Sequence, residues 1–424
     1  MGPQEGCVCG LDVGTTKVCA VVGKEDLSGE MAVVGIGLVP SDGMQRGVVV
    51  DRELALGSVR RCLEEAGEAS GTRIARVWVG LTGGHISSAN VRGRAYVAGP
   101  QVTQTDMDHA VESARESVAM TSDRRIIQHT LRDFVLDGEK GIKRPLGMMG
   151  RQLDVELHVV TGRASVVDNL LACVTGAGVQ VAAEVLEPPA TARAVLTDAE
   201  LSLGCVLIDI GGGTTDLAVF GNGSICHTSA VPVGGNQVTM DVARLLRISP
   251  EQAEQVKRQF GHALAEEVPE HEEIDITVVG SEQRERASRK LLAEIIQARM
   301  EEILEAVGQQ LTAEGLWSLA PAGVVVSGGG AELPGTASLA TSILGGLPAR
   351  IGSPLPLRGR FDLVDQPMYA TAVGLALMAL EAGDWCTRRV TPTREGGADA
   401  LNALQCLWGR ALGAWHRWLA AHGR

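Results

Sequence analysis

Aromatic residues are scarce, making up 3% of the 424 residues, while hydrophobic residues as a whole make up 45%. The core must therefore consist mainly of aliphatic side chains, which suits buried sheets covered by helices. Basic residues are also outnumbered, 38 against 51 acidic ones, giving a net charge of −13. So acidic a protein is a poor match for nucleic acid or for anionic lipid, unless a local segment reverses the charge.

Several common sequence signals are missing. The nine cysteines show no CxxC pair, which argues against a zinc site and favours reduced cytosolic thiols. The longest apolar run, Ala370–Leu380, falls short of the roughly 20 residues of a membrane-spanning helix, and we expect no signal peptide. No GxxxxGK[ST] motif is present, which excludes a P-loop, and no dinucleotide-binding glycine fingerprint follows the first strand.

Hydrophobic periodicity predicts an α/β protein. Strand–turn–strand patterns cover Val8–Val22 and Leu203–Gly223, and further strands are expected at 31–39, 48–50, 76–81, 86–97, 126–136, 152–160, 179–186 and 323–327. Helices are expected at 52–66, 106–117, 165–177, 190–197, 238–246, 250–260, 286–311 and 369–380, with a further one after Pro334-Gly335. The charged stretch Glu266–Glu285 is expected to be irregular, a strand with loops.

One motif occurs twice, almost 200 residues apart, as in a duplicated domain. Each copy is an apolar strand ending in Asp, a glycine turn with two threonines, and a second apolar strand. The first copy supplies Asp12, Gly14, Thr15, Thr16 and Lys17, and the second supplies Asp209, Gly211, Gly212, Gly213, Thr214 and Thr215.

The motif suits a triphosphate with its metal ion. Glycines let backbone N–H groups approach phosphate oxygens closely, and successive N–H groups form an anion nest. Asp12 and Asp209 could hold Mg²⁺ through water, since Mg²⁺ keeps much of its water shell. A third glycine turn, Gly328, Gly329 and Gly330, follows strand 324–327 and could hold a nucleoside. We therefore expect two hairpins that close on one ATP.

These residues resemble the FtsA family of bacterial cell-division proteins, from about Val8 to Leu380. Further segments are similar to family signatures, namely 43–51, 137–142, 145–150, 369–375 and 232–236, which contains Gly234 and Gly235. The resemblance implies an actin-like ATPase fold of two related α/β domains around a nucleotide cleft, with a small inserted SHS2-like α+β module.

The family resemblance also implies a division of the chain. Subdomain 1A would comprise 1–83 with 163–197, the inserted subdomain 1C 84–162, subdomain 2A 198–237 with 312–386, and subdomain 2B 238–311. A linker, 387–399, and an amphipathic helix, 400–424, would follow.

The function implied by the resemblance is structural. Such proteins bind ATP and Mg²⁺, polymerise, and tether the FtsZ ring to the inner face of the cell membrane at the septum. The C-terminal peptide of FtsZ would bind within subdomain 2B, and later division proteins would be recruited. We expect at most slow hydrolysis of ATP, and the sequence does not give its rate.

Two sets of residues have alternative interpretations. Glu254 and Lys257 resemble the ribose and adenine contacts of the related filament protein MreB, but they could equally form an ordinary exposed helix face. The dipeptide Glu187-Pro188 resembles the segment where actin-like ATPases orient the attacking water. Glu187 is therefore the candidate catalytic residue. A structural turn before the following helix is the alternative for Glu187.

The tail has a different composition. An apolar stripe with a spacing of three to four residues lies on one side of an expected helix, with aromatic and basic residues beside it. The candidate membrane-contacting residues are Leu401, Leu404, Leu407, Trp408, Leu412, Trp415, Trp418, Leu419, Arg410 and Arg417. No acidic residue follows Asp399, a pattern typical of an interfacial membrane helix. The alternative is a helix that docks on the body of the protein or on a partner.

Two other functions share the expected fold. A small-molecule kinase would need an acceptor cleft and a catalytic base, and the sequence offers no such constellation. A pilus-assembly adaptor would have little use for a lipid-binding tail. The preferred function is therefore that of a division-ring adaptor.

Overall fold

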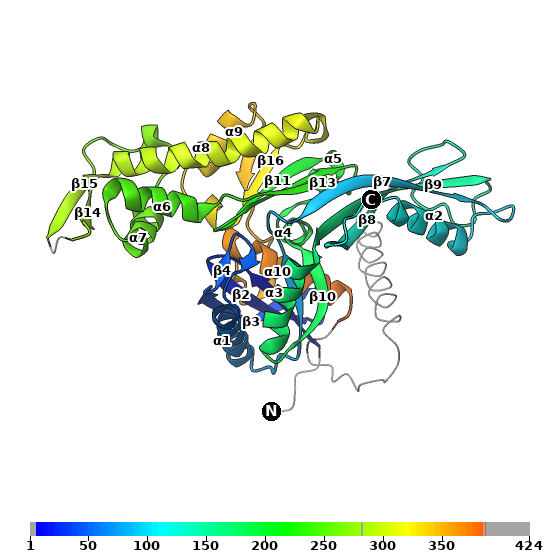
Figure 1. Ribbon diagram of the computed structural model, residues 1–424, viewed down its shortest axis with the longest axis horizontal. Coiled ribbons are helices and arrows are strands. Elements are labelled where there is room, and N and C mark those ends of the chain that lie inside the picture. Colours follow the sequence, from blue (N-terminus) through cyan, green and yellow to red (C-terminus); the bar gives the residue numbers. More distant parts are fainter. Residues whose placement is uncertain (1–5, 281–282, 385, 387–424) are drawn as a thin grey trace.

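The computed structural model describes residues 6–280, 283–384 and 386, and the expected tail helix lies outside them. Two domains, each a sheet with helices, lie one above the other in Figure 1, and a third, smaller body extends to one side. No helix in the described part of the chain is long and apolar enough to span a bilayer.

The first domain has a six-stranded sheet in the order β10-β6-β1-β2-β3-β18. The strands are β1 (Cys7–Val13), β2 (Lys17–Glu25), β3 (Met31–Pro40), β6 (Arg76–Leu81), β10 (Gln180–Leu186) and β18 (Arg358–Gly359). Helices α1 (Arg52–Ser70) and α3 (Ala164–Gly176) pack on one face. A two-stranded ribbon, β4 (Met44–Gln45) and β5 (Val48–Val49), precedes α1.

The second domain repeats this topology. Its sheet has the order β13-β12-β11-β16-β17. The strands are β11 (Cys205–Ile210), β12 (Thr215–Gly221), β13 (Ser224–Val231), β16 (Val324–Ser327) and β17 (Ala349–Ile351). In both domains the first three strands form an antiparallel meander. A parallel strand pairs with the first strand of the meander, and a second parallel strand pairs with that one in turn. The duplication expected from the motif thus extends to the strand order.

Two helices, α4 (Glu187–Val195) and α10 (Ala370–Glu381), lie between the two sheets and share one core with both. Small residues allow their close approach: a Cβ on Gly374 would lie 1.7 Å from the Ala190 carbonyl oxygen, and one on Gly10 would lie 2.3 Å from the Ala372 oxygen. The short α5 (Asp198–Leu203) follows α4.

The outer part of the second domain is helical. It consists of α6 (Gly235–Leu246), α7 (Pro250–Phe260), α8 (Arg289–Ala313) and α9 (Thr336–Ile343), with the hairpin β14 (Glu273–Thr277) and β15 (Arg284–Ser288) at its far end (Figure 1). Short 3-10 turns η3 (Gly329–Glu332) and η5 (Pro367–Tyr369) flank the glycine-rich end of β16.

The inserted module is a three-stranded antiparallel sheet, β7-β9-β8, with α2 (Gln104–Glu116) on one face. Its strands are β7 (Ser87–Tyr96), β8 (Arg124–Leu136) and β9 (Gln152–Arg163). The module also contacts the second domain, because Ser88 Oγ donates to the Thr228 carbonyl at 2.7 Å and Asn90 Nδ2 to the Cys226 carbonyl at 3.0 Å.

Two predicted elements were wrong in their bounds. The long helix expected from Arg286 begins at Arg289, because Arg284–Ser288 pairs with Glu273–Thr277 as a strand. The stretch expected to be irregular therefore contains an ordered hairpin, whose Ile274 and Ile276 side chains are buried. The helix expected from Ala190 begins at Glu187, with two prolines in its first turn.

Candidate functional site

The two glycine turns predicted to face one another lie in direct contact. Each turn is closed by a backbone hydrogen bond, from Gly14 N to Lys17 O at 3.0 Å and from Gly211 N to Thr214 O at 2.9 Å. A Cβ on Gly212 would lie 2.4 Å from Thr16 Cγ2. A larger residue at position 212 would clash with Thr16 in this arrangement. The glycine of the second turn therefore allows the threonine of the first turn to contact it.

The β4–β5 ribbon contacts both turns. Thr15 Oγ1 accepts a hydrogen bond from Gly47 N at 3.2 Å, while a Cβ on Gly213 would lie 3.0 Å from Arg46 Cα and 2.5 Å from Thr15 Oγ1. Both ribbon-turn residues have positive φ, 49° for Arg46 and 75° for Gly47. The segment 43–51 resembles a family signature, and its place beside the two turns makes it part of the site.

Two further glycine segments surround the second turn. The N–H groups of Gly235 and Asn236, at the start of α6, donate to the carbonyls of Gly211 and Gly212 at 2.9 and 2.8 Å. At the end of β16, Gly328 adopts φ of 82°, and a Cβ there would lie 2.2 Å from Asp209 Oδ1. Gly330 packs on Ile210, and Gly329 lies between these two in η3. The three glycine segments predicted from the sequence therefore converge.

Buried carboxylates gather beneath the turns. Asp12, Asp209, Asp216 and Glu187 are each less than a tenth exposed. Asp12 Oδ2 pairs with Lys17 Nζ at 2.8 Å, and Asp209 Oδ2 accepts hydrogen bonds from Thr191 Oγ1 at 2.8 Å and Thr371 Oγ1 at 3.3 Å.

The carboxylates perturb one another. Burial raises the pKa of Glu187 well above its usual range, and Asp12, Asp216 and Asp209 raise it further. Glu187 Oε1 has no hydrogen-bond partner among the described residues. Burial lowers the pKa of Lys17, but Asp12, Cys19 and Asp209 together more than reverse this, and the net shift is upward. Ionisation of all four carboxyl groups would therefore leave an excess of negative charge that Lys17 alone does not neutralise.

A divalent cation that contacts the carboxylates through water molecules would neutralise this excess of negative charge. Within residues 6–280, 283–384 and 386, no group of three or more His, Cys, Asp or Glu side chains is arranged to hold a metal ion directly. Mg²⁺ commonly keeps several waters and contacts carboxylates through them. Asp12 and Asp209 fit that outer-shell arrangement.

Asp216 is a site residue that sequence reasoning missed. It follows the two threonines of the second turn, at the position that Lys17 holds in the first. Its Oδ1 accepts a hydrogen bond from Thr82 Oγ1 at 2.5 Å, and Thr82 directly precedes the inserted module. Burial raises the pKa of Asp216 to about 7, and Asp209 and Asp12 act in the same direction. The sequence did contain a signal for Asp216, because Asp216 and Lys17 occupy the same position in the two copies of the motif.

Glu254 and Lys257, predicted as nucleoside contacts, lie beside the start of α6. Lys257 is 8% exposed, which contradicts the alternative of an ordinary exposed helix face for this residue. Lys257 Nζ pairs with Glu254 Oε2 at 2.6 Å and donates to Thr239 Oγ1 at 2.8 Å and to the Gly235 carbonyl at 3.3 Å. The ammonium group thus ties α7 to the glycine segment that supports the second turn.

Glu187 is the first residue of α4 and lies in the acidic cluster. The alternative interpretation placed Glu187 in a turn before the helix. That placement is wrong, because α4 includes Glu187. A Cβ on Gly80 would lie 3.0 Å from Glu187 Cγ, so β6 packs against its side chain.

We expect the acidic cluster to make stability depend on pH. Because Asp216, Asp209 and Glu187 bind protons more tightly in the folded chain than in the unfolded one, the free energy of unfolding should fall as pH rises from about 4 to about 7. The variant Asp216→Asn keeps an acceptor for Thr82 and removes one charge, so its melting temperature at pH 8 should rise by a few degrees.

Thermal melts between pH 5.5 and 8 without nucleotide measure this effect. The matched control is Asp275→Asn, which alters an exposed carboxylate on β14 and should leave the profile unchanged. An identical pH slope in wild type and Asp216→Asn would contradict the account of the cluster.

Solved structures of the same architecture support the fold. A chain of the PilM-PilN type IV pilus biogenesis complex matches with a TM-score of 0.64 and 20% identity, covering 88% of this chain and 98% of that chain. MreB5 of Spiroplasma citri bound to AMPPNP matches with a TM-score of 0.50 and 18% identity, covering 88% and 95%. At these identities the likeness concerns the fold alone. The duplicated domains and converging glycine turns define a protein of the actin-like ATPase fold, as the sequence predicted.

Sequence comparison gives the family. The family described as "Cell division protein FtsA" matches residues 206–374, and "SHS2 domain inserted in FTSA" matches residues 83–161. The FtsA proteins of Pseudomonas aeruginosa and Escherichia coli K12 are 38% and 34% identical to this chain, covering 88% and 87% of it and 89% of each relative. The chain belongs to the FtsA family of cell-division proteins, which confirms the predicted resemblance and supports a role in cell division.

Proposed function

We propose that ATP with Mg²⁺ binds between the two domains, where the glycine turns converge. The observation that carries this proposal is the contact of Thr16 with Gly212, which brings the two phosphate-type turns to one place. The backbone N–H groups and threonine hydroxyls of these turns would contact the phosphates. Bound Mg²⁺ would supply positive charge, and Asp12 and Asp209 would hold its water shell.

The nucleoside would lie against the third glycine segment. Gly329 leaves room for a flat ring, because an added Cβ there would meet nothing nearer than 4.0 Å, while Gly328 and Gly330 pack on the end of β11. Glu254, whose side chain is 42% exposed, is the proposed ribose contact, and Lys257 fixes its position through their ion pair. Gly234 and Gly235 would act indirectly, by holding the second turn in the position in which it contacts the β-phosphate.

Hydrolysis, where it occurs, would involve Glu187. Its unpartnered Oε1 is free to orient a water molecule, but its raised pKa keeps it protonated until a cation enters the cluster. Turnover would therefore be slow and would depend on Mg²⁺. This role remains compatible with a protein whose output is assembly rather than chemistry.

Assembly and tethering complete the proposal. The protein would polymerise and anchor the FtsZ ring to the cytoplasmic face of the inner membrane at the septum through the segment 400–424. The C-terminal peptide of FtsZ would bind in the region 238–311, where Met240, Leu245 and Leu291 are exposed apolar side chains. Recruitment of later division proteins would follow from the same platform.

The test is filament formation on membranes. Purified protein with ATP and Mg²⁺ should form filaments on anionic vesicles by electron microscopy, and Asp209→Asn should form far fewer. Asp275→Asn, on the exposed face of β14, serves as the matched control. Nucleotide-independent binding of single molecules would contradict the proposal, and phosphorylation of a small acceptor without filaments would favour the kinase alternative.

A further inference from the structure

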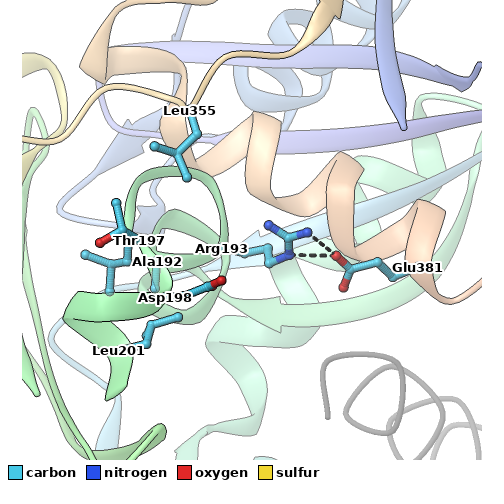
Figure 2. A pocket seen from close by; sticks show the side chains of 8 residues that line it. Ala192, Arg193, Thr197, Asp198, Leu201, Leu355 and Glu381 are labelled. Carbon is cyan, nitrogen blue, oxygen red and sulfur yellow. Dashed lines mark hydrogen bonds and ion pairs between the residues drawn. The ribbon is translucent and has the colours of Figure 1, made fainter. Parts of the chain in front are cut away.

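A pocket of about 290 Å³ lies between α4, α5, α10 and the segment before β18, at the opposite end of α4 from Glu187 (Figure 2). Leu196, Leu201 and Leu355 give it an apolar lining. Its polar rim includes Asp198 and the ion pair of Arg193 with Glu381, joined in Figure 2 by dashed lines. The nucleotide proposed above uses none of these side chains.

The described chain ends close to this pocket. Glu381 is the last residue of α10, and five residues later Cys386 is fixed to the first residue of β1, an interior strand of the first sheet. Cys386 N donates to the Cys7 carbonyl at 2.6 Å, and Asp384 pairs with Arg76 at 2.6 Å. Five residues span at most about 18 Å, so Cys386 lies within that distance of Glu381, and residue 387 follows it directly.

The remaining chain can reach the pocket easily. Residues 387–400 number 14, and a random-coil chain of 14 residues has a root-mean-square span of roughly 20 Å. A tether with this reach gives an effective concentration in the millimolar range at a nearby site. Weak docking of the tail on its own body would therefore be populated.

The chemistry of pocket and tail is complementary. Residues 401–424 contain leucines and three tryptophans with no acidic residue, while Arg410 and Arg417 are basic. The pocket offers an apolar floor of leucines with Asp198 at its rim, where Glu381 is paired with Arg193. One tryptophan and a neighbouring leucine would fill a space of this size.

We propose that this pocket holds the apolar stripe of the chain's own segment 401–424 when no membrane is present. This inference rests on the proposed membrane-anchoring function, because the same stripe would insert into lipid. Lipid and pocket then compete for one surface of the tail. The apparent affinity for vesicles equals the intrinsic affinity multiplied by the fraction of molecules whose tail is not docked.

The test uses the full-length protein with the photocrosslinker p-benzoylphenylalanine in place of Trp408. Irradiation without vesicles should cross-link position 408 to peptides containing residues 192–201 or 355, with a yield independent of protein concentration. A concentration-dependent yield would indicate a second copy as the occupant, and cross-links elsewhere on the body would indicate another surface. Either result would overturn the proposal.

A substitution in the pocket supplies the second readout. Leu355→Arg places a charge in the pocket, and the matched control Leu38→Arg alters a leucine of β3 with the same exposure, 36%. Leu355→Arg should lose the cross-link and bind anionic vesicles about three- to tenfold more tightly than wild type and the control. Retention of the cross-link in Leu355→Arg, or equal vesicle affinity in all three proteins, would contradict docking. If none of them binds vesicles, the membrane function fails, and the cross-link alone decides the docking proposal.

Discussion

The variant Gly212→Ala should lose ATP affinity by about 100-fold. Its Cβ would lie 2.4 Å from Thr16 Cγ2 and 2.6 Å from Thr16 Oγ1, well inside van der Waals contact. The two turns would have to separate by about 1 Å, a displacement that typically costs two orders of magnitude at a site that depends on orientation. Titration with a fluorescent ATP analogue in the presence of Mg²⁺ measures the loss.

The matched control is Gly57→Ala in α1, where an added Cβ meets nothing within 4 Å. It should keep wild-type affinity and gain slightly in stability, because alanine favours a helix over glycine. Equal ATP affinity in Gly212→Ala and wild type, with both proteins folded by thermal melting, would show that the two turns do not share the triphosphate.

The double variant Trp408→Glu/Trp415→Glu should reduce binding to anionic vesicles by roughly 100-fold or more. Each tryptophan transferred to lipid contributes about 1.5–3 kcal/mol, and the two glutamates add repulsion from anionic headgroups. Co-sedimentation with vesicles across a lipid titration measures the change. Deletion of residues 401–424 should abolish binding altogether.

The control for the tail variant adds two glutamates outside the apolar stripe. Gly397→Glu/Ala398→Glu alters the expected linker by two glutamates and should leave vesicle binding within about threefold, since linker charges contact lipid only through screened interactions. Equal losses in both double variants would mean that net charge, rather than insertion of the apolar stripe, controls attachment.

The sequence predicted the parts of the site that depend on local backbone geometry. The duplicated Asp-to-glycine turns and the glycine segment after β16 were identified because close approach of backbone requires glycine, whatever the surrounding fold. Their convergence followed from the topology of duplicated domains, and the direct contact of Thr16 with Gly212 agrees with it.

Other features depend on tertiary contacts that the sequence does not display. In the sequence Asp216 is an ordinary strand residue, and only the fold shows that Thr82, directly after β6, donates to its carboxylate. The strand Arg284–Ser288 has no buried apolar alternation of its own. The sequence therefore predicts its first two residues as irregular and the rest as helix, although Ile274 and Ile276 on the partner strand show a period of two. The pocket beside Leu355 exists only because α4, α5 and α10 meet there.

A crystal structure of the full-length protein with a non-hydrolysable ATP analogue and Mg²⁺ tests the central claim most directly. The account predicts that the phosphates lie between residues 14–16 and residues 211–214, with Mg²⁺ joined to Asp12 and Asp209 through water. A nucleotide bound elsewhere, or phosphates that contact only one of the two turns, would contradict it.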